Sequence, residues 1–544
     1  MIIIGLIIIA TYQYHFINFT WDDPFITWRY AENLTKGIGI VFNEGERVEG
    51  YSNLLYVLIF ALLYKLHVYW GELRLLYPAK IMGSLTSFGL IWFTLKYATR
   101  LRSFRELGYP KAAIIIGFIA VINPYLHIWA MCGMETLLYP FLTLLGNLVL
   151  IDQIDNQNHG KIKSFIIAGL IFFLVSITRA DGFVIVFATL VFLFFLLLRK
   201  TLTLRQCLVF FFSWLIPSLI VLAWRYWYYG DIFPMSYYSK ATGGWPQIVA
   251  GLSQWWLGAR TILGSFILYL FIYLPIFARK GRPGPAYSLI FSQALVYQLY
   301  IIYSGTDWLL GDRFFTHIIP QFELMLFAGI SELLKLDPKF KTPLLLEHKL
   351  DKYRLRLIIL IIVLIAGLNY QNISGFLVLK HGHFTSGYKN ITDYLAGHAK
   401  NPWPSWMMIE YYDAGIWMKQ NAKPTDLLAI GDIGAIPYIS GVKVIDCLGL
   451  TDKYIAKLPG NFFYQKADID YILGDKPGYN ETRPDFIILE GFLRQGKDNK
   501  IYYEPWSPIF NNYMVLLFND QRFQERYQLV YQKDFFLVFK LRSG

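Results

Sequence analysis

Two adjacent carboxylates, Asp22 and Asp23, open a polar segment in a chain that is otherwise strongly apolar. Two acids held close together split their pKa values, which suits one of them to act as a base. Such a pair can also hold a divalent cation or stabilise an oxocarbenium-like centre. The alternative is structural, because an Asp that precedes Pro24 is a good helix start. The residue types leave open which of the two would be the cap and which the catalyst.

Five basic residues are candidates for binding a phosphate, because guanidinium and ammonium groups are the usual phosphate partners in proteins. The strongest is Arg179, which ends an uncharged apolar stretch and is followed by Ala-Asp-Gly. An arginine at a membrane interface can instead be an anchor whose charged head reaches water. The candidates are Arg29, Arg47, Arg179, Lys240 and Arg313.

Other polar positions have two interpretations each. Glu135 follows Gly133 and could be a second carboxylate of the site, or an acid that favours a helix N-terminus. The run 431–435 (GDIGA) resembles a glycine-rich phosphate loop but lacks its third glycine and a Lys-Ser/Thr pair, so a tight strand-to-helix turn explains it. We expect His317 and Glu323 to be buried polar groups whose hydrogen bonds are satisfied.

The composition predicts a polytopic α-helical membrane protein. Of the 544 residues, 55% are hydrophobic and 16% are charged, against roughly a quarter charged in soluble domains. The formal net charge of +12 comes from short basic blocks between apolar runs. That arrangement is typical of cytoplasmic loops in membrane proteins and not of nucleic-acid binding.

The apolar runs predict about eleven spans, since a crossing needs about 20 residues. With the basic blocks on the cytoplasmic side, the N-terminus is inside and the C-terminus outside. The run 54–66 is short for a crossing, so we expect a re-entrant or interfacial helix within a first outer loop, 19–76; twelve spans are the alternative. The spans are expected near 2–18, 77–96, 111–131, 135–151, 164–178, 182–198, 206–226, 261–278, 286–304, 314–334 and 356–370.

After residue 370 the composition changes to that of a soluble domain, so we divide the chain into a membrane domain, 1–370, and an outer-face α/β domain, 371–544. The pattern predicts a helix over 409–420 and a terminal hairpin. Strands are expected at 427–431, 442–447, 484–490, 527–532 and 535–540.

Residues 22–53 (DDPFITWRYAENLTKGIGIVFNEGERVEGYSN) resemble the first outer loop of a group of GT-C glycosyltransferases. That group includes the mycobacterial terminal arabinofuranosyltransferases and uncharacterised bacterial relatives. Further runs that match are GMET (133–136), RADG (179–182), YYGDIFPMSYYSK (228–240), GDRFFTHIIP (311–320) and GDIGAIPYISGVKVIDCLGLTD (431–452).

The resemblance implies a GT-C fold and a polyprenyl-phosphate-linked sugar as donor, the sugar being a pentose such as arabinofuranose or a hexose. Transfer to a cell-envelope glycan or glycolipid would occur on the outer face of the bacterial cytoplasmic (inner) membrane. By matching position, Asp22 or Asp23 is the base, Glu135 a second acid, and Arg179 a cation near the donor phosphate. The cofactor that Asp22, Asp23 and Glu135 could hold is a divalent cation. A flippase, exporter or binding protein for a lipid-linked sugar is the alternative function.

Overall fold

The computed structural model describes two compact units. Unit 1 comprises Met1–Ile17, Lys80–Val221 and Gly244–Gly382, and unit 2 comprises Asn18–Ala79, Leu222–Gly243 and His383–Gly544. The predicted boundary at residue 370 and the predicted span 356–370 lie outside the described residues, as does most of 261–278. Those described are 2–17, 19–69, 71, 73–155, 161–240, 243–262, 269–270, 272–273, 284–305, 313–335, 406–460, 467–495, 501–505 and 512–542.

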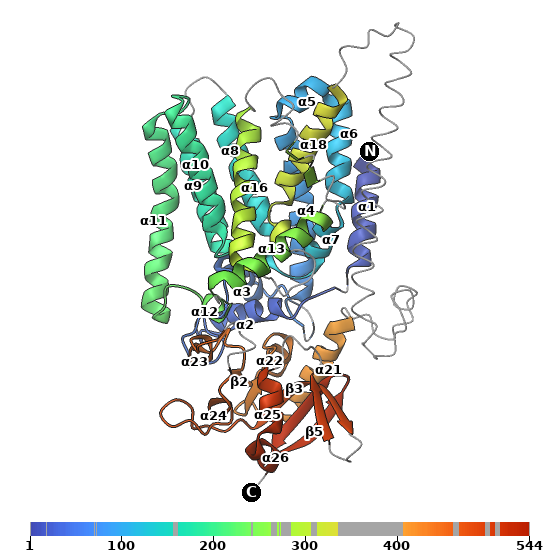
Figure 1. Cartoon of the computed structure of the whole chain (residues 1–544), viewed down its shortest axis with the longest axis vertical. Coiled ribbons are helices and arrows are strands. Elements are labelled where there is room, and N and C mark those ends of the chain that lie inside the picture. The colour runs from blue at the N-terminus through green and yellow to red at the C-terminus, as the bar shows by residue number, and fades with distance from the viewer. Residues whose placement is uncertain are drawn as a thin grey trace. The chain divides into compact units, whose positions relative to one another are not determined.

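Unit 1 is helical, and its helices α8, α9, α10 and α16 run side by side (Figure 1). Small residues allow close approach: a Cβ added at Gly251 of α13 would lie 1.9 Å from the Ile302 carbonyl oxygen of α16. The helices with residues in this unit are α1 (Ile2–His15), α4 (Leu76–Ala98), α5 (Arg102–Leu107), α6 (Tyr109–Ile122), α7 (Pro124–Met131), η1 (Glu135–Leu137), α8 (Leu138–Asp155), α9 (Ile162–Thr178), α10 (Gly182–Leu198), α11 (Leu204–Tyr229), α13 (Gly244–Thr261), α16 (Pro285–Ser304), α17 (Arg313–Thr316) and α18 (Ile319–Lys335).

Three helical segments within the described ranges are long and apolar enough to cross a membrane, namely Glu135–Ile154, α11 and α16. A fourth is obtained if α6 and α7 form one span. Helices α9 and α10 are apolar but shorter, at 17 residues each. The structure thus supports a membrane protein, while the number of eleven spans stays a prediction.

The predicted span 111–131 is broken in the structure, where α6 and α7 meet at an angle of 46°. Pro124 has no N–H to continue the helical ladder. The side chain of Asn123 accepts a hydrogen bond from the Tyr125 N–H at 3.1 Å and caps the new helix. The short helix α7 then leads through Gly133, at φ 88°, to Glu135.

Unit 2 contains a six-stranded sheet in the order β2-β1-β3-β6-β5, with β4 paired to β3. Strand β1 is parallel to β2 and β3, whereas β6 is antiparallel to β3 and β5. The predicted strands and hairpin are confirmed, and β3 continues past its predicted end because β4 pairs with it. The strands are β1 (Leu427–Ile430), β2 (Lys443–Asp446), β3 (Phe486–Gln495), β4 (Ile501–Pro505), β5 (Tyr527–Lys533) and β6 (Phe536–Leu541).

Helices cover both faces of this sheet. Tyr411 of α21 packs on Phe536 with ring centroids 4.8 Å apart, and Phe523 of α26 packs on Phe539 at 4.9 Å. Residues three apart in a strand point to opposite faces. The other helices of the unit are α2 (Asp23–Thr35), α3 (Leu54–Lys65), α12 (Met235–Lys240), α21 (Trp406–Asn421), α22 (Ala435–Ser440), α23 (Lys453–Ala456), α24 (Ile469–Ile472), α25 (Asn512–Asn519) and α26 (Gln521–Arg526).

The first loop is part of unit 2 and closes one edge of the sheet. The Asn43 side chain donates to the Val444 carbonyl at 2.8 Å and accepts from the Val444 N–H at 3.1 Å, as a neighbouring strand would. An edge strand left open would present unpaired backbone groups. The 12-residue helix α3 packs on α2, so the short run expected within the first loop forms a helix there.

The carboxylate of Asp22 binds the N-terminal end of α22. Its Oδ2 accepts from the Gly434 N–H at 2.8 Å and its Oδ1 from the Ala435 N–H at 2.6 Å. These N–H groups have no partner within the helix, and the positive end of the helix dipole favours an acid there. A Cβ at Gly434 would lie 2.3 Å from Oδ2, so the contact requires glycine.

Arg29, two turns further along α2, binds carbonyls at the opposite end of α22. Its Nη1 donates to the Pro437 carbonyl at 2.9 Å and its Nη2 to that of Val442 at 2.7 Å. Its Nε donates to the Phe42 carbonyl at 2.9 Å. One helix of the first loop therefore holds both ends of a helix that lies about 400 residues later.

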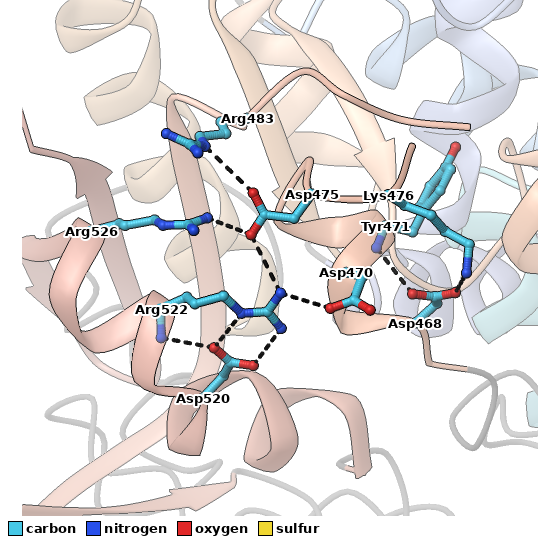
Figure 2. A network of polar contacts seen from close by, with 9 residues as sticks. All are labelled: Asp468, Asp470, Tyr471, Asp475, Lys476, Arg483, Asp520, Arg522 and Arg526. Carbon is cyan, nitrogen blue, oxygen red and sulfur yellow. Dashed lines mark hydrogen bonds and ion pairs between the residues drawn. The ribbon is translucent and has the colours of Figure 1, made fainter. Parts of the chain in front are cut away.

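Charged side chains of the C-terminal region form a network at the surface (Figure 2). Asp475 pairs with Arg526 at 2.5 Å, and Arg522 binds Asp470 at 2.7 Å and Asp520 at 2.8 Å. Half-exposed pairs of this kind contribute little each. The network ties α24 to α26, and its arginines are already engaged by carboxylates.

We expect Arg29→Gln to destabilise unit 2, because the buried Val442 carbonyl loses its donor. The Pro437 carbonyl keeps the Gly441 N–H, and the Phe42 carbonyl keeps the Asn33 side chain. One buried group left unsatisfied costs about 1–3 kcal/mol. Thermal unfolding in detergent measures it, with the exposed Arg47→Gln as the matched control. An Arg29 variant with an unchanged melting temperature and lost activity would instead favour the predicted phosphate role.

Candidate active-site clusters

The two carboxylates of the predicted pair have different surroundings. Asp22 is buried, and both of its oxygens bind backbone N–H groups of α22. It makes no side-chain cap bond to its own helix α2. Asp23 is the first residue of α2 and is the more exposed of the two. The structure thus gives Asp22 a capping role, but toward α22 and not toward its own helix α2.

Three further acidic or phenolic groups lie near this pair, and sequence reasoning missed them. Asp432 precedes α22 and hydrogen-bonds to Glu490 of β3, and it also accepts from the Tyr411 hydroxyl. Two carboxyl groups can share a hydrogen bond only if one of them holds a proton. The only sequence signal was the position of Asp432 within the run 431–435.

Burial and mutual repulsion raise the pKa values of this group. Burial raises the pKa of Asp432 to about 6, with the charge of Asp23 adding to the effect. Burial, followed by the charge of Asp432, also raises the pKa values of Asp22 and Glu490 well above their usual range. The cluster therefore holds protons at a pH where isolated carboxyl groups have lost them.

The run 431–435 is explained by the same contact. A loop that leads from a strand into a helix N-terminus is a ready anion site. Here Asp22 of the same chain is the anion bound by the Gly434 and Ala435 N–H groups. The turn expected from the sequence is present, and its amides bind a carboxylate.

The basic candidates of unit 2 lie in separate surroundings. Arg29 holds α22, as described above. Arg47 is exposed and stacks on the Tyr228 ring at 4.8 Å from its centroid. Lys240 ends α12 and is half-buried. A phosphate role for these three stays a prediction.

A buried ion pair in the same unit was not among the predicted site residues. Glu49 pairs with Arg225 at 2.9 Å, and both side chains are buried. Burial raises the pKa of Glu49 to about 7 against the opposing effect of Arg225. Nearby, the hydroxyls of Tyr51 and Tyr229 lie 3.0 Å apart. These contacts join the first loop to segment 222–243.

In unit 1 the structure brings the candidates Glu135 and Arg179 together. The Arg179 Nη1 donates to Glu135 Oε1 at 2.7 Å, and its Nε donates to Asp181 Oδ1 at 3.0 Å. All three side chains are buried. Asp181 belongs to the RADG run, but sequence reasoning did not select it. The guanidinium charge of Arg179 is thus shared by two carboxylates.

The same cluster continues through Tyr297 to His317. The Tyr297 hydroxyl lies 2.5 Å from Asp181 Oδ2 and 2.7 Å from His317 Nδ1. Arg313 is buried at the start of α17, and its charge acts on His317 together with that of Arg179. We expected both nitrogens of His317 to be satisfied, and this is wrong for Nε2, which has no hydrogen-bond partner among the residues that the structure describes. Glu323 Oε1 accepts from the Asn123 side chain at 3.1 Å, but its Oε2 has no hydrogen-bond partner among the described residues, so the expectation is wrong for that oxygen too.

Within the described part of the chain, no group of three or more His, Cys, Asp or Glu side chains is arranged to hold a metal ion. A divalent cation bound by Asp22, Asp23 and Glu135 therefore stays a prediction.

Comparison with known proteins matches residues 405–539 to a family model described as a domain of unknown function, DUF8728. No curated protein matches the sequence. Among solved structures, ArnT from Cupriavidus metallidurans bound to undecaprenyl phosphate is similar, with a TM-score of 0.56, 12% identity and coverage of 99% of this chain and 96% of that one. The archaeal oligosaccharyltransferase AglB from Archaeoglobus fulgidus, in complex with an inhibitory peptide and a dolichol-phosphate, has a TM-score of 0.54, 11% identity and coverage of 97% and 79%. The chain therefore shares its fold with these two structures, and a fold of the GT-C type is what the resemblance of its first loop implies.

Proposed function

We propose that this protein is a membrane glycosyltransferase of the GT-C type that takes a sugar from a polyprenyl-phosphate carrier. The observation that carries the proposal is the arrangement of the first-loop carboxylates: α22 fixes Asp22, while Asp23 stands more exposed beside it. The fold shared with ArnT and AglB, whose structures hold undecaprenyl phosphate and dolichol-phosphate, supports the donor class.

In the proposed reaction the acceptor hydroxyl oxygen bonds to the anomeric carbon of the donor sugar. The bond from that carbon to the phosphate oxygen breaks, and its electron pair leaves with the polyprenyl phosphate. The hydroxyl proton passes to Asp23, which acts as general base. No nucleotide is required, because the phosphate is already the leaving group.

Arg313 is our candidate for binding the donor phosphate. The positive charge of Arg179 lies in the same cluster, since both arginines act on His317. Fixed cations stabilise the negative charge that a departing phosphate gains. Arg179 already pairs with Glu135 and Asp181, so its remaining contribution is smaller. Arginine is suited to this task because its planar donors match phosphate oxygens.

The finer features are proposals that follow from the family resemblance. The transferred sugar is a pentose such as arabinofuranose or a hexose, and the acceptor is a cell-envelope glycan or glycolipid. We place the reaction on the extracytoplasmic side of the bacterial inner membrane.

The primary test is incubation of the purified protein with polyprenyl-phosphate-linked arabinofuranose and mannose and a glycan acceptor. Consumption of donor with release of polyprenyl phosphate supports the proposal. Donor that is bound or moved across vesicles without being consumed would support a carrier or binding protein instead.

We expect Asp23→Asn to lower the transfer rate at least 100-fold, the scale of a lost general base, with an unchanged melting temperature. Asp22→Asn should lower the melting temperature, because an amide nitrogen would face an N–H of Gly434 or Ala435. Rates and unfolding are measured on the same preparations. Normal transfer by the Asp23 variant would remove its role as base.

We expect Asp432→Asn to move the acidic limb of the pH–rate profile to lower pH. With a pKa of about 6, Asp432 is negatively charged at neutral pH and opposes ionisation of Asp23. Above about pH 6, where Asp432 carries that charge, its removal lets Asp23 ionise more readily, so activity persists to lower pH within that range. The measurement is kcat/KM between about pH 5 and 8; a shift toward higher pH would contradict the electrostatic coupling.

Arg313→Gln should raise the KM for the lipid-linked donor by about tenfold or more, since a charge-assisted hydrogen bond contributes about 1.5–3 kcal/mol. Arg313→Lys should recover part of this because it retains the charge. Donor-titration kinetics separate KM from kcat, with Arg260→Gln on the exposed side of α13 as control. An unchanged KM would exclude Arg313 from phosphate binding.

A further inference from the structure

His317, a buried residue of unit 1, has one ring nitrogen with a hydrogen-bond partner and one without. The side chain has no exposed surface. Its Nδ1 lies 2.7 Å from the Tyr297 hydroxyl, which in turn lies 2.5 Å from Asp181 Oδ2. Its Nε2 has no hydrogen-bond partner within the described ranges.

The contacts of Tyr297 decide where the imidazole proton lies. The tyrosine hydroxyl has a single proton but three polar neighbours, namely Asp181, His317 and the Tyr139 hydroxyl. Asp181 also pairs with Arg179 at 3.0 Å, so it is ionised and can only accept. Tyr297 therefore donates to Asp181, and its oxygen must accept from an Nδ1–H of His317.

With the proton on Nδ1, the neutral imidazole has a bare lone pair on Nε2. A second proton there would create an imidazolium beside the charges of Arg179 and Arg313, which repel it. A buried acceptor without a partner is unfavourable. The chain of Asp181, Tyr297 and His317 thus holds a buried hydrogen-bond acceptor ready for a donor group.

We propose that His317 is a specificity residue whose Nε2 accepts a hydrogen bond from one hydroxyl group of the transferred sugar. The inference rests on the proposed function and adds to it a polar contact that selects the sugar. A sugar hydroxyl fits because it donates a proton, whereas a phosphate oxygen and a lone pair repel each other.

A second buried histidine shows that the assignment depends on the network and not on burial alone. His127 is equally buried, but its Nε2 bonds the Val121 carbonyl at 2.8 Å, so the proton is on Nε2. Its ring stacks on Tyr12 at 4.9 Å, and no carboxylate or guanidinium contact of its ring is seen in the described structure. Its Nδ1 also has no hydrogen-bond partner among the described residues. His127 is therefore the matched control, with the opposite tautomer and no charged network beside its unpartnered nitrogen.

The functional test combines protein and substrate changes. The donor that the unmodified protein consumes, polyprenyl-phosphate-linked arabinofuranose or mannose, is prepared with each sugar hydroxyl replaced by hydrogen in turn. We expect His317→Phe to lower kcat/KM for the complete donor by about 10- to 100-fold. For the one analogue that lacks the bonded hydroxyl, the same variant should cause less than about a twofold further loss.

Controls separate this outcome from a general loss of structure. Tyr297→Phe keeps His317 but removes the oxygen that holds the proton on its Nδ1. This variant should therefore lose part of the discrimination between the complete donor and the analogue that lacks the bonded hydroxyl. His127→Phe should alter kcat/KM for all donors by the same factor. Equal losses for His317→Phe with every analogue would overturn the inference, while the proposed function stands if the unmodified protein transfers the sugar.

The tautomer is measured independently of activity by NMR of protein labelled with 15N-histidine. The His317 signals, identified by their absence in His317→Phe, should show a protonated Nδ1 and an unprotonated Nε2. The His127 signals should show the reverse. A protonated Nε2 on His317 overturns the inference whatever the result of the transfer assay.

Discussion

The bond between the Asp22 carboxylate and the N-terminal amides of α22 is the contact on which unit 2 depends. A buried carboxylate is costly unless its oxygens are satisfied, and Gly434 and Ala435 satisfy both. Arg29 gives the other end of α22 the complementary charge. The acid meets the positive end of the helix dipole and the arginine its negative end. The first loop and the C-terminal sheet consequently form one compact unit.

That arrangement concentrates acidic groups near Asp23. The loop that offers its amides to Asp22 also carries Asp432, and Asp432 shares a hydrogen bond with Glu490. Asp22 and Glu490 are buried and Asp432 is half-buried. Three carboxyl groups so close together cannot all be ionised at low cost, so protons are retained on the cluster. The residue that remains more exposed, Asp23, therefore has neighbours whose charge changes near neutral pH. A general base in this position would respond to the protonation of the C-terminal domain.

Hydrophobic periodicity and turn residues predicted the helices and strands but not which of them contact each other. The strands of the C-terminal domain alternate or form short apolar runs, and so their existence and the hairpin could be predicted. The broken span at Asn123 and Pro124 had a local signal, which we did not use. The contacts of Asp22 and Arg29 with the two ends of α22 had no local signal in the sequence. They join residues about 400 positions apart, and their partners are backbone atoms, which any residue type has. Asp432, Glu490 and Tyr297 were missed because their side-chain partners lie elsewhere in the sequence, and only the fold brings them together. Glu135 and Arg179 were found by their positions at apolar boundaries.

The buried charges of unit 1 show why an arginine at a predicted phosphate position does not by itself make a phosphate site. Arg179 lies between Glu135 and Asp181, at 2.7 and 3.0 Å, so one cation faces two carboxylates. A phosphate approaching this group alone would meet a net negative charge. With Arg313 included, the two arginines balance the charges of Glu135 and Asp181. The negative charge of a bound phosphate would then have no opposite charge left to balance it. The pairing of Asp181 with Arg179 also keeps Asp181 ionised, and this ionisation is what orients the proton of Tyr297 and the tautomer of His317. The network is therefore better suited to orienting hydrogen-bond donors and acceptors than to supplying bulk positive charge, and a polyhydroxylated substrate is the kind of ligand that such orientation can select.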